Sequence, residues 1–132
     1  MSERSQLFNQ VIASSAGKKL VKRIAAGGAL SCGGVDLAGW AHLGAILGVQ
    51  THRPVVLLTG KLKQQEILQQ DLETWLRLLK SDMKAQFYPD WEVLPHEDKL
   101  PHADVISERL EALQALKGEQ LPVITATVAS LM

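Results

Sequence analysis

The chain has 132 residues, 46% hydrophobic and 21% charged, which is the composition of one folded domain and excludes a disordered or fibrous segment. Fourteen Lys and Arg balance fourteen Asp and Glu, so no overall positive field attracts nucleic acid. The single cysteine, Cys32, excludes an internal disulfide, and no apolar run is long enough for a signal peptide or a membrane span. We expect a cytoplasmic protein.

Two short helices are predicted at the start of the chain. Apolar residues recur at helical spacing over residues 7–12 and again over residues 20–24. We assign residues 1–17 to a helical lead-in and residues 18–132 to one lobe. The basic residues of the segment 18–23 fall mostly opposite its apolar stripe, so we interpret them as a solvated helix face and not as a nucleic-acid site.

Four buried strands are predicted in the remainder, over residues 29–32, 55–60, 85–88 and 122–127. The continuous aliphatic run at 55–60 is typical of a parallel strand that is covered on both faces. With a helix over 39–49 between the first two strands, the pattern is a strand, helix, strand unit. The predicted fold class is therefore α/β, a parallel sheet of about four strands with helices on both faces.

Two more helices complete the predicted order. The longest spans residues 61–80, and its apolar face is Leu68, Leu72, Trp75, Leu76 and Leu79. After a proline-rich loop at 89–101, Asp104 is predicted to cap a helix with the apolar face Ile106, Leu110 and Leu113. The last five residues, 128–132, begin a further apolar helix without a C-terminal cap, so we expect the chain to be a piece of a longer protein.

A degenerate phosphate-binding loop follows the first predicted strand. Gly34 and Gly39 have the spacing of a P-loop, in which Lys and then Ser or Thr follow the second glycine. Here those two positions are Trp40 and Ala41. An indole carries no positive charge and alanine offers no oxygen to Mg²⁺, so we expect a RecA-like lobe that binds no nucleotide and has no catalytic residue, no cofactor and no metal.

The chain resembles a family of repair proteins. Residues 20–24, 34–39 and 53–57 have the order and spacing of the first motor lobe of the excision-repair helicase subunit UvrB, whose P-loop lysine and threonine fall on Trp40 and Ala41. The later motifs are more similar to the transcription-repair coupling factors, which carry a degenerate UvrB-like module at the N-terminus. These motifs, which we interpret as structural or interface residues, are Asp90, Trp91, Glu92, Leu94 and Pro95, with Ser107, Glu108 and Arg109.

The resemblance implies a non-catalytic scaffold that supports recruitment of UvrA to stalled RNA polymerase. In that family a separate C-terminal motor uses ATP to move on DNA and push the polymerase, and the UvrA contacts lie mainly in a small domain that would follow residue 132. UvrB inserts a long aromatic hairpin at about the position where this chain has only residues 96–106. Damage verification by this lobe is therefore not expected.

Two other functions stay open from the sequence. One alternative is that the lobe binds ATP through a non-standard P-loop as part of a helicase or translocase. The other is that it shields another surface of its parent protein and keeps that parent inactive. A metal site at His96, Glu97, Asp98 and His102 is disfavoured because these residues lie in one loop without a cysteine. Cys32 is interpreted as a small buried hydrophobic residue, and Trp91 as a residue that packs over the sheet edge or anchors a partner.

Overall fold

The computed structural model describes residues 3–94 and 96–132 and has a parallel sheet between two helical layers. Three helices, α1 (Glu3–Ala13), α2 (Ser15–Ala26) and α3 (Leu37–Thr51), precede the first strand, β1 (Val55–Thr59). Next come α4 (Leu62–Leu78), β2 (Lys84–Tyr88), α5 (Ala103–Ala115), β3 (Pro122–Thr127) and the short 3₁₀ turn η1 (Ala129–Leu131). The predicted α/β class is confirmed.

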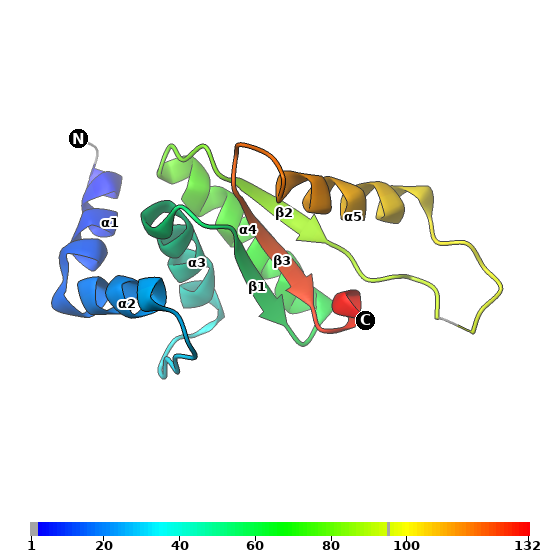
Figure 1. Ribbon diagram of the computed structural model, residues 1–132, viewed down its shortest axis with the longest axis horizontal. Coiled ribbons are helices and arrows are strands. Elements are labelled where there is room, and N and C mark those ends of the chain that lie inside the picture. The colour runs from blue at the N-terminus through cyan, green and yellow to red at the C-terminus, as the bar shows by residue number, and fades with distance from the viewer. Residues whose placement is uncertain (1–2, 95) are drawn as a thin grey trace.

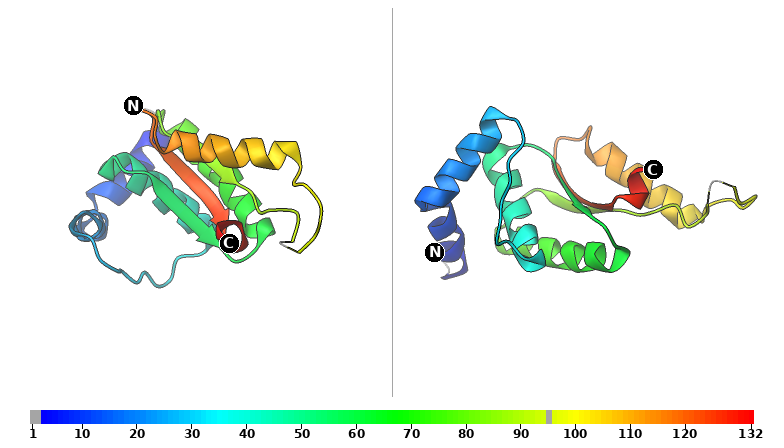
Figure 2. Two further views of the ribbon diagram at one scale, coloured as in Figure 1. Left: turned by 45° about the vertical axis from the view of Figure 1, so that its right-hand side comes forward. Right: turned by 90° about the horizontal axis from the view of Figure 1, so that it is seen from below.

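The sheet has the order β1-β3-β2, and both pairings are parallel. Val55 is in register with Val123, and Lys84 is in register with Pro122, so all three strands end at the same edge. The central strand β3 is buried along its whole length. Figure 2 shows α4 on one face of the sheet and α5 on the other, as expected when parallel strands are joined by crossover helices.

The main core lies between the sheet and the layer formed by α3 and α4. Ala45, Leu72 and Val123 are fully buried there, and Phe8 of α1 is 3% exposed. Two glycines of α3 let this helix approach the sheet closely, because an added Cβ would lie 2.9 Å from a Leu57 methyl carbon at Gly44 and 2.8 Å from the Met83 methyl carbon at Gly48. Through Phe8 and the buried side of α3, α1 and α3 share one core with the sheet, whereas α2 contributes no buried residue.

The predicted first strand at residues 29–32 is wrong, since within the described residues the sheet has three strands and not four. This segment is irregular, and glycines flank it on both sides; Gly27, Gly28 and Gly34 have positive φ values of 82°, 92° and 77°. Four residues between such glycines bury too little apolar surface to offset the backbone entropy of a strand. Cys32 is accordingly half-buried and not in a core.

Three details of the helices also differ from the predictions. His102 and not Asp104 is the N-cap of α5, and its Nδ1 accepts from the Asp104 amide at 3.4 Å. The side of α5 that is buried carries Val105, Arg109 and Ala112, while the predicted apolar face is exposed. After β3 the chain forms only the 3₁₀ turn η1, which Ser130 closes against Thr127.

Candidate functional site

The P-loop-like segment leads into α3 and places an acidic residue at the N-terminus of this helix. Asp36 is the N-cap of α3, and its Oδ1 accepts from the Gly39 amide at 2.8 Å. A carboxylate therefore occupies a position at the helix N-terminus where a P-loop binds phosphate, and its negative charge opposes a second anion. A Cβ at Gly39 would lie 2.8 Å from a Val35 methyl carbon, so this glycine serves packing of the loop.

Trp40 and Ala41 have separate roles at the start of α3. Ala41 is fully buried, whereas Trp40 is 39% exposed. Trp40 lines a hollow of 390 Å³ along β1, together with Leu37, Val56 and Leu58. Its walls are mainly apolar, and they offer no cation to a phosphate.

Three family-motif residues, Asp90, Trp91 and Arg109, meet at the carboxyl ends of β2 and β3, where the side chain of Arg109 is buried. The guanidinium carbon lies 4.2 Å from the Tyr88 ring centroid and 4.0 Å from the Trp91 ring centroid. Nη1 of Arg109 donates to the Pro89 carbonyl at 2.7 Å and to the Ser130 carbonyl at 3.0 Å. We call Tyr88, Asp90, Trp91, Arg109, Thr127 and Ser130 the arginine cluster.

Hydrogen bonds of Thr127 and Ser130 complete the arginine cluster. The Thr127 hydroxyl donates to the Asp90 carboxylate. The Ser130 hydroxyl donates to the Thr127 carbonyl at 2.7 Å and accepts from the Thr127 amide at 3.1 Å. This network connects the loop after β2, the helix α5 and the turn after β3, and it holds the guanidinium through aromatic faces and carbonyl oxygens rather than through a carboxylate.

The remaining motif residues lie outside the arginine cluster. Glu92 and Leu94 are exposed in the loop after β2, and Pro95 lies outside the described residues. Ser107 and Glu108 are exposed on α5, and Glu108 faces a hollow of 440 Å³ that it shares with Asp90 and Glu92. The structure therefore brings Asp90, Trp91 and Arg109 together and leaves the other described members at the surface around them.

Two further buried polar groups, in Gln65 and His42, have no signal in the sequence pattern. Gln65, which falls on the predicted polar face of α4, is fully buried, and its Nε2 donates to the Tyr88 and Thr125 carbonyls at 3.0 and 2.9 Å. His42 is stacked on Trp75 with ring centroids 4.3 Å apart and meets Phe8 edge to face at 4.9 Å. Burial lowers the pKa of His42 below its ordinary value, because the charged ring would lose its hydration.

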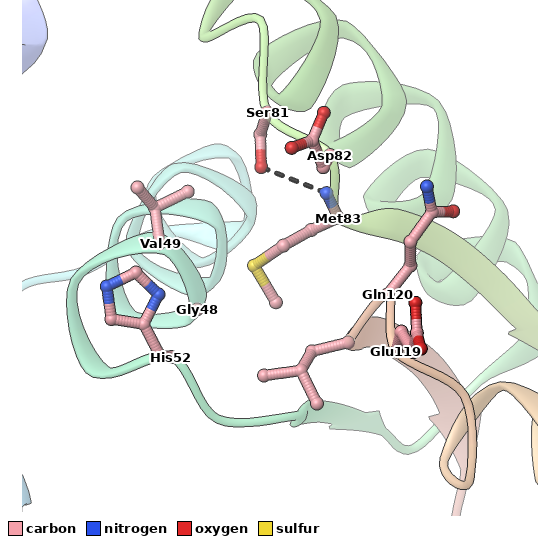
Figure 3. A pocket seen from close by; sticks show the side chains of 9 residues that line it. Gly48, Val49, His52, Ser81, Asp82, Met83, Glu119 and Gln120 are labelled. Carbon is pink, nitrogen blue, oxygen red and sulfur yellow. Dashed lines mark hydrogen bonds between the residues drawn. The ribbon is translucent and has the colours of Figure 1, made fainter.

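A third hollow, of 410 Å³, opens at the opposite end of the sheet (Figure 3). Its wall includes His52, Asp82 and Glu119, and the side chain of Met83 extends into it. It lies at the amino ends of the strands, whereas ligands of open α/β sheets bind beyond the carboxyl ends. The arginine cluster therefore has the more favourable position for function.

The described residues contain neither a cluster of metal ligands nor a helix that could cross a membrane. No group of three or more His, Cys, Asp or Glu side chains in residues 3–94 and 96–132 is arranged to hold a metal ion. No helix in the same part of the chain is both long and apolar enough to cross a membrane.

Comparison with known proteins gives two matches. The transcription-repair-coupling factor of Escherichia coli (strain K12) is 32% identical over 79 residues, which are 60% of this chain and 6% of that protein. Over this stretch the chain is similar to a transcription-repair-coupling factor. The factor of Haemophilus influenzae (strain ATCC 51907 / DSM 11121 / KW20 / Rd) is 34% identical over 55 residues, 39% of this chain and 5% of that protein.

The matches cover only a small share of these coupling factors, about a twentieth of their length. No protein-family model and no solved structure matches the chain. The similarity to the coupling factors is therefore confined to a short segment of those proteins.

Proposed function

We propose that this chain is a non-catalytic scaffold lobe of a transcription-repair coupling factor that supports recruitment of UvrA to stalled RNA polymerase. The observation that carries the proposal is the start of α3, where Trp40 and Ala41 replace the P-loop cation and hydroxyl and Asp36 occupies the Gly39 amide. The relationship to the coupling factors supplies the repair context. DNA and RNA polymerase would be contacted by other parts of the parent protein, which would carry the ATP-dependent motor.

The arginine cluster gives the lobe its scaffold character. It fixes the loop after β2 against the turn after β3, so Trp91 is held with one ring face on Arg109 while 42% of its surface stays exposed. Glu92 and Leu94 follow on the same loop and are also exposed. A rigid loop with an exposed aromatic and acidic rim suits the support of a neighbouring domain.

Nucleotide binding tests the first half of the proposal. Isothermal titration of the chain with Mg-ATP should give no binding heat, and the double change Trp40→Lys and Ala41→Thr should not create affinity, because Asp36 still occupies the Gly39 amide. Adding Asp36→Gly to the double variant removes that carboxylate and is the matched comparison. Micromolar Mg-ATP binding by the unchanged chain would refute the non-catalytic assignment and favour an ATP-binding lobe.

A pull-down of purified UvrA tests the second half. The chain is compared with a version extended by the following domain of its parent, on the order of 100 residues. We expect only the extended version to retain UvrA, since the proposal places the direct contact outside this lobe. Equal retention by the chain alone would assign the contact to this lobe, with Trp91 as the first residue to change, and no retention by either version would reject UvrA recruitment.

A further inference from the structure

An apolar surface on the α5 side of the sheet lacks a covering element among the described residues. On α5, Ile106, Leu110 and Leu113 are 39%, 52% and 47% exposed. At 100° per residue these three side chains form a flank beside the buried side that carries Val105 and Arg109. The sequence pattern is that of a buried helix face, yet solvent covers it here.

The flank of α5 opposite the apolar one carries Glu108 and Glu111, and its neighbours show where the apolar flank points. Glu108 shares a hollow with Phe87 of β2, and Glu111 shares another with Lys84 and Gln86. The acidic flank of α5 therefore borders the outer side of β2. The apolar flank must point the other way, across β3 toward β1.

β1 presents the second half of the same surface. Val55 and Leu57 pack against the core under α3 and α4, so Val56 and Leu58 point to the face on which α5 lies. They are 53% and 50% exposed, and Figures 1 and 2 show α5 beside β2 and β3, with no described helix over β1 on that face of the sheet. We call Val56, Leu58, Ile106, Leu110 and Leu113 the open face.

Chain topology identifies which kind of element fits the open face. The crossover from β2 through α5 to β3 places its helix on this face. A right-handed crossover that continues from β3 past β1 places its helix on the same face, next to α5 and over β1. The chain leaves β3 beside the end of β1, because the Val128 amide donates to the Thr59 carbonyl at 3.0 Å.

The charged residues beside β1 indicate which residues that helix would carry along its edges. The charged residues that flank β1 are Arg53 before it and Lys61 after it, and both are exposed. The strand and the apolar flank of α5 carry no carboxylate. A helix with acidic residues along its edges would therefore complement the ends of the open face.

We propose that the open face is the docking site of one amphipathic helix with an apolar stripe and acidic edges, supplied by the remainder of a longer coupling factor. This inference rests on the proposed function for the source of the helix. The relatives have ample polypeptide for it, since the matched stretches are only 6% and 5% of their lengths. The helix would run antiparallel to the strands, as α5 does.

A synthetic helix tests the docking site without UvrA or ATP. The probe is a labelled helical peptide of 13 residues, the length of α5, with a Leu stripe and Glu on the other positions. Fluorescence anisotropy should give a Kd of about 100 µM or tighter, several-fold tighter than for a peptide with Lys in place of Glu. A scrambled peptide of equal composition should not bind.

Surface variants localise the contact. Val56→Gln with Leu110→Gln should weaken binding of the acidic peptide about tenfold, while Ile67→Gln, an equally apolar change on the exposed side of α4, should leave it unchanged. Circular dichroism melts check that each variant is folded. Absent binding, equal binding of the scrambled peptide, or equal affinity of the double variant would overturn the proposal, and so would a dimer in sedimentation that the double variant abolishes, because a second copy would then occupy the face.

Discussion

Arg109 is the residue on which most of the motif contacts converge. Its guanidinium is buried between two aromatic rings and donates to two main-chain carbonyls, Pro89 and Ser130. Hydrogen bonds from a charged donor contribute more than neutral ones, and both carbonyls lose their partner together if the donor is removed. The side chain therefore acts as a structural connection between β2, α5 and η1.

Replacement of Arg109 should consequently destabilise the chain. We expect Arg109→Ala to lower the free energy of unfolding by about 2–4 kcal/mol, and Arg109→Lys to lower it by about half as much because lysine lacks the planar fork. Urea unfolding followed by tryptophan fluorescence measures both. Arg77→Ala on the exposed side of α4 is the control and should change stability by less than about 0.5 kcal/mol.

His42 makes the stability of the chain depend on pH. Its Nε2 is buried without a hydrogen-bond partner, and burial lowers its pKa below the ordinary value of about 6.5. Between the folded pKa and about 6.5 the unfolded chain binds the proton and the folded chain does not, so stability is full above about pH 6.5 and falls as the pH drops through this window.

The matching experiment is a series of urea unfolding curves from pH 5 to pH 8. His42→Phe should flatten the dependence of stability on pH near and below 6.5, because Phe fills the aromatic stack without a titrating group. His52→Gln, at an exposed histidine, should keep the slope of the unchanged chain. An unchanged slope in His42→Phe would assign the pH dependence to other groups.

At the scale of elements, α3 is placed by its glycines. Its hydrophobic residues surround the helix, so periodicity alone gives it no face, but Gly44 and Gly48 face the sheet and the side chain of Leu57 or Met83 fills the space of the missing Cβ. Glycine in a helix is ordinarily unfavourable by about 1 kcal/mol relative to alanine. The close packing of α3 against β1 and β3 offsets that cost.

Gly44→Val should therefore destabilise the chain by about 2–3 kcal/mol, because the added methyl groups collide with the Leu57 side chain in a close-packed layer. Thermal unfolding by circular dichroism measures the loss. Gly33→Val is the comparison, since nothing lies within 4 Å of a Cβ there and its φ is not in the left-handed region. A similar loss in both variants would indicate a general effect of valine and not a clash.

At the scale of the whole molecule, the start of the chain is part of the core. Phe8 of α1 meets the rings of His42 on α3 and Trp75 on α4, with ring centroids 4.9 and 5.7 Å away. These contacts join segments more than 30 residues apart in sequence. The predicted helical lead-in, residues 1–17, therefore contributes Phe8 to the core that it shares with the rest of the chain.

Truncation of this contact gives a whole-molecule test. Phe8→Ala should cost about 3 kcal/mol and shift the fluorescence of Trp75 to longer wavelength, because a cavity opens beside a half-buried indole. Leu7→Ala, at a neighbour that is 58% exposed, should change neither quantity appreciably. Unaltered stability in Phe8→Ala would show that α1 is not held by this contact.

The sequence by itself determined the α/β class, the three strands of the sheet and the presence of Trp40 and Ala41 at the two positions after Gly39. Local patterns suffice for these features. An aliphatic run such as residues 55–59 predicts a buried strand, and a tryptophan at the P-loop lysine position shows that the lysine is missing, without knowledge of distant contacts. The additional strand predicted at residues 29–32 is wrong, because the flanking glycines raise the entropic cost of forming a strand. The local sequence does not show whether pairing with another strand would offset that cost.

Only the tertiary structure decided which side chains meet. Arg109 lies in a stretch that reads as a polar helix start, and its burial depends on Tyr88, Trp91 and Ser130 from three other segments. Likewise, Ile106, Leu110 and Leu113 have the spacing of a core face, but the direction of α5 is set by how its connections cross the sheet. Periodicity defines a face, and topology decides what that face meets, because contacts between distant segments leave no local mark on the sequence.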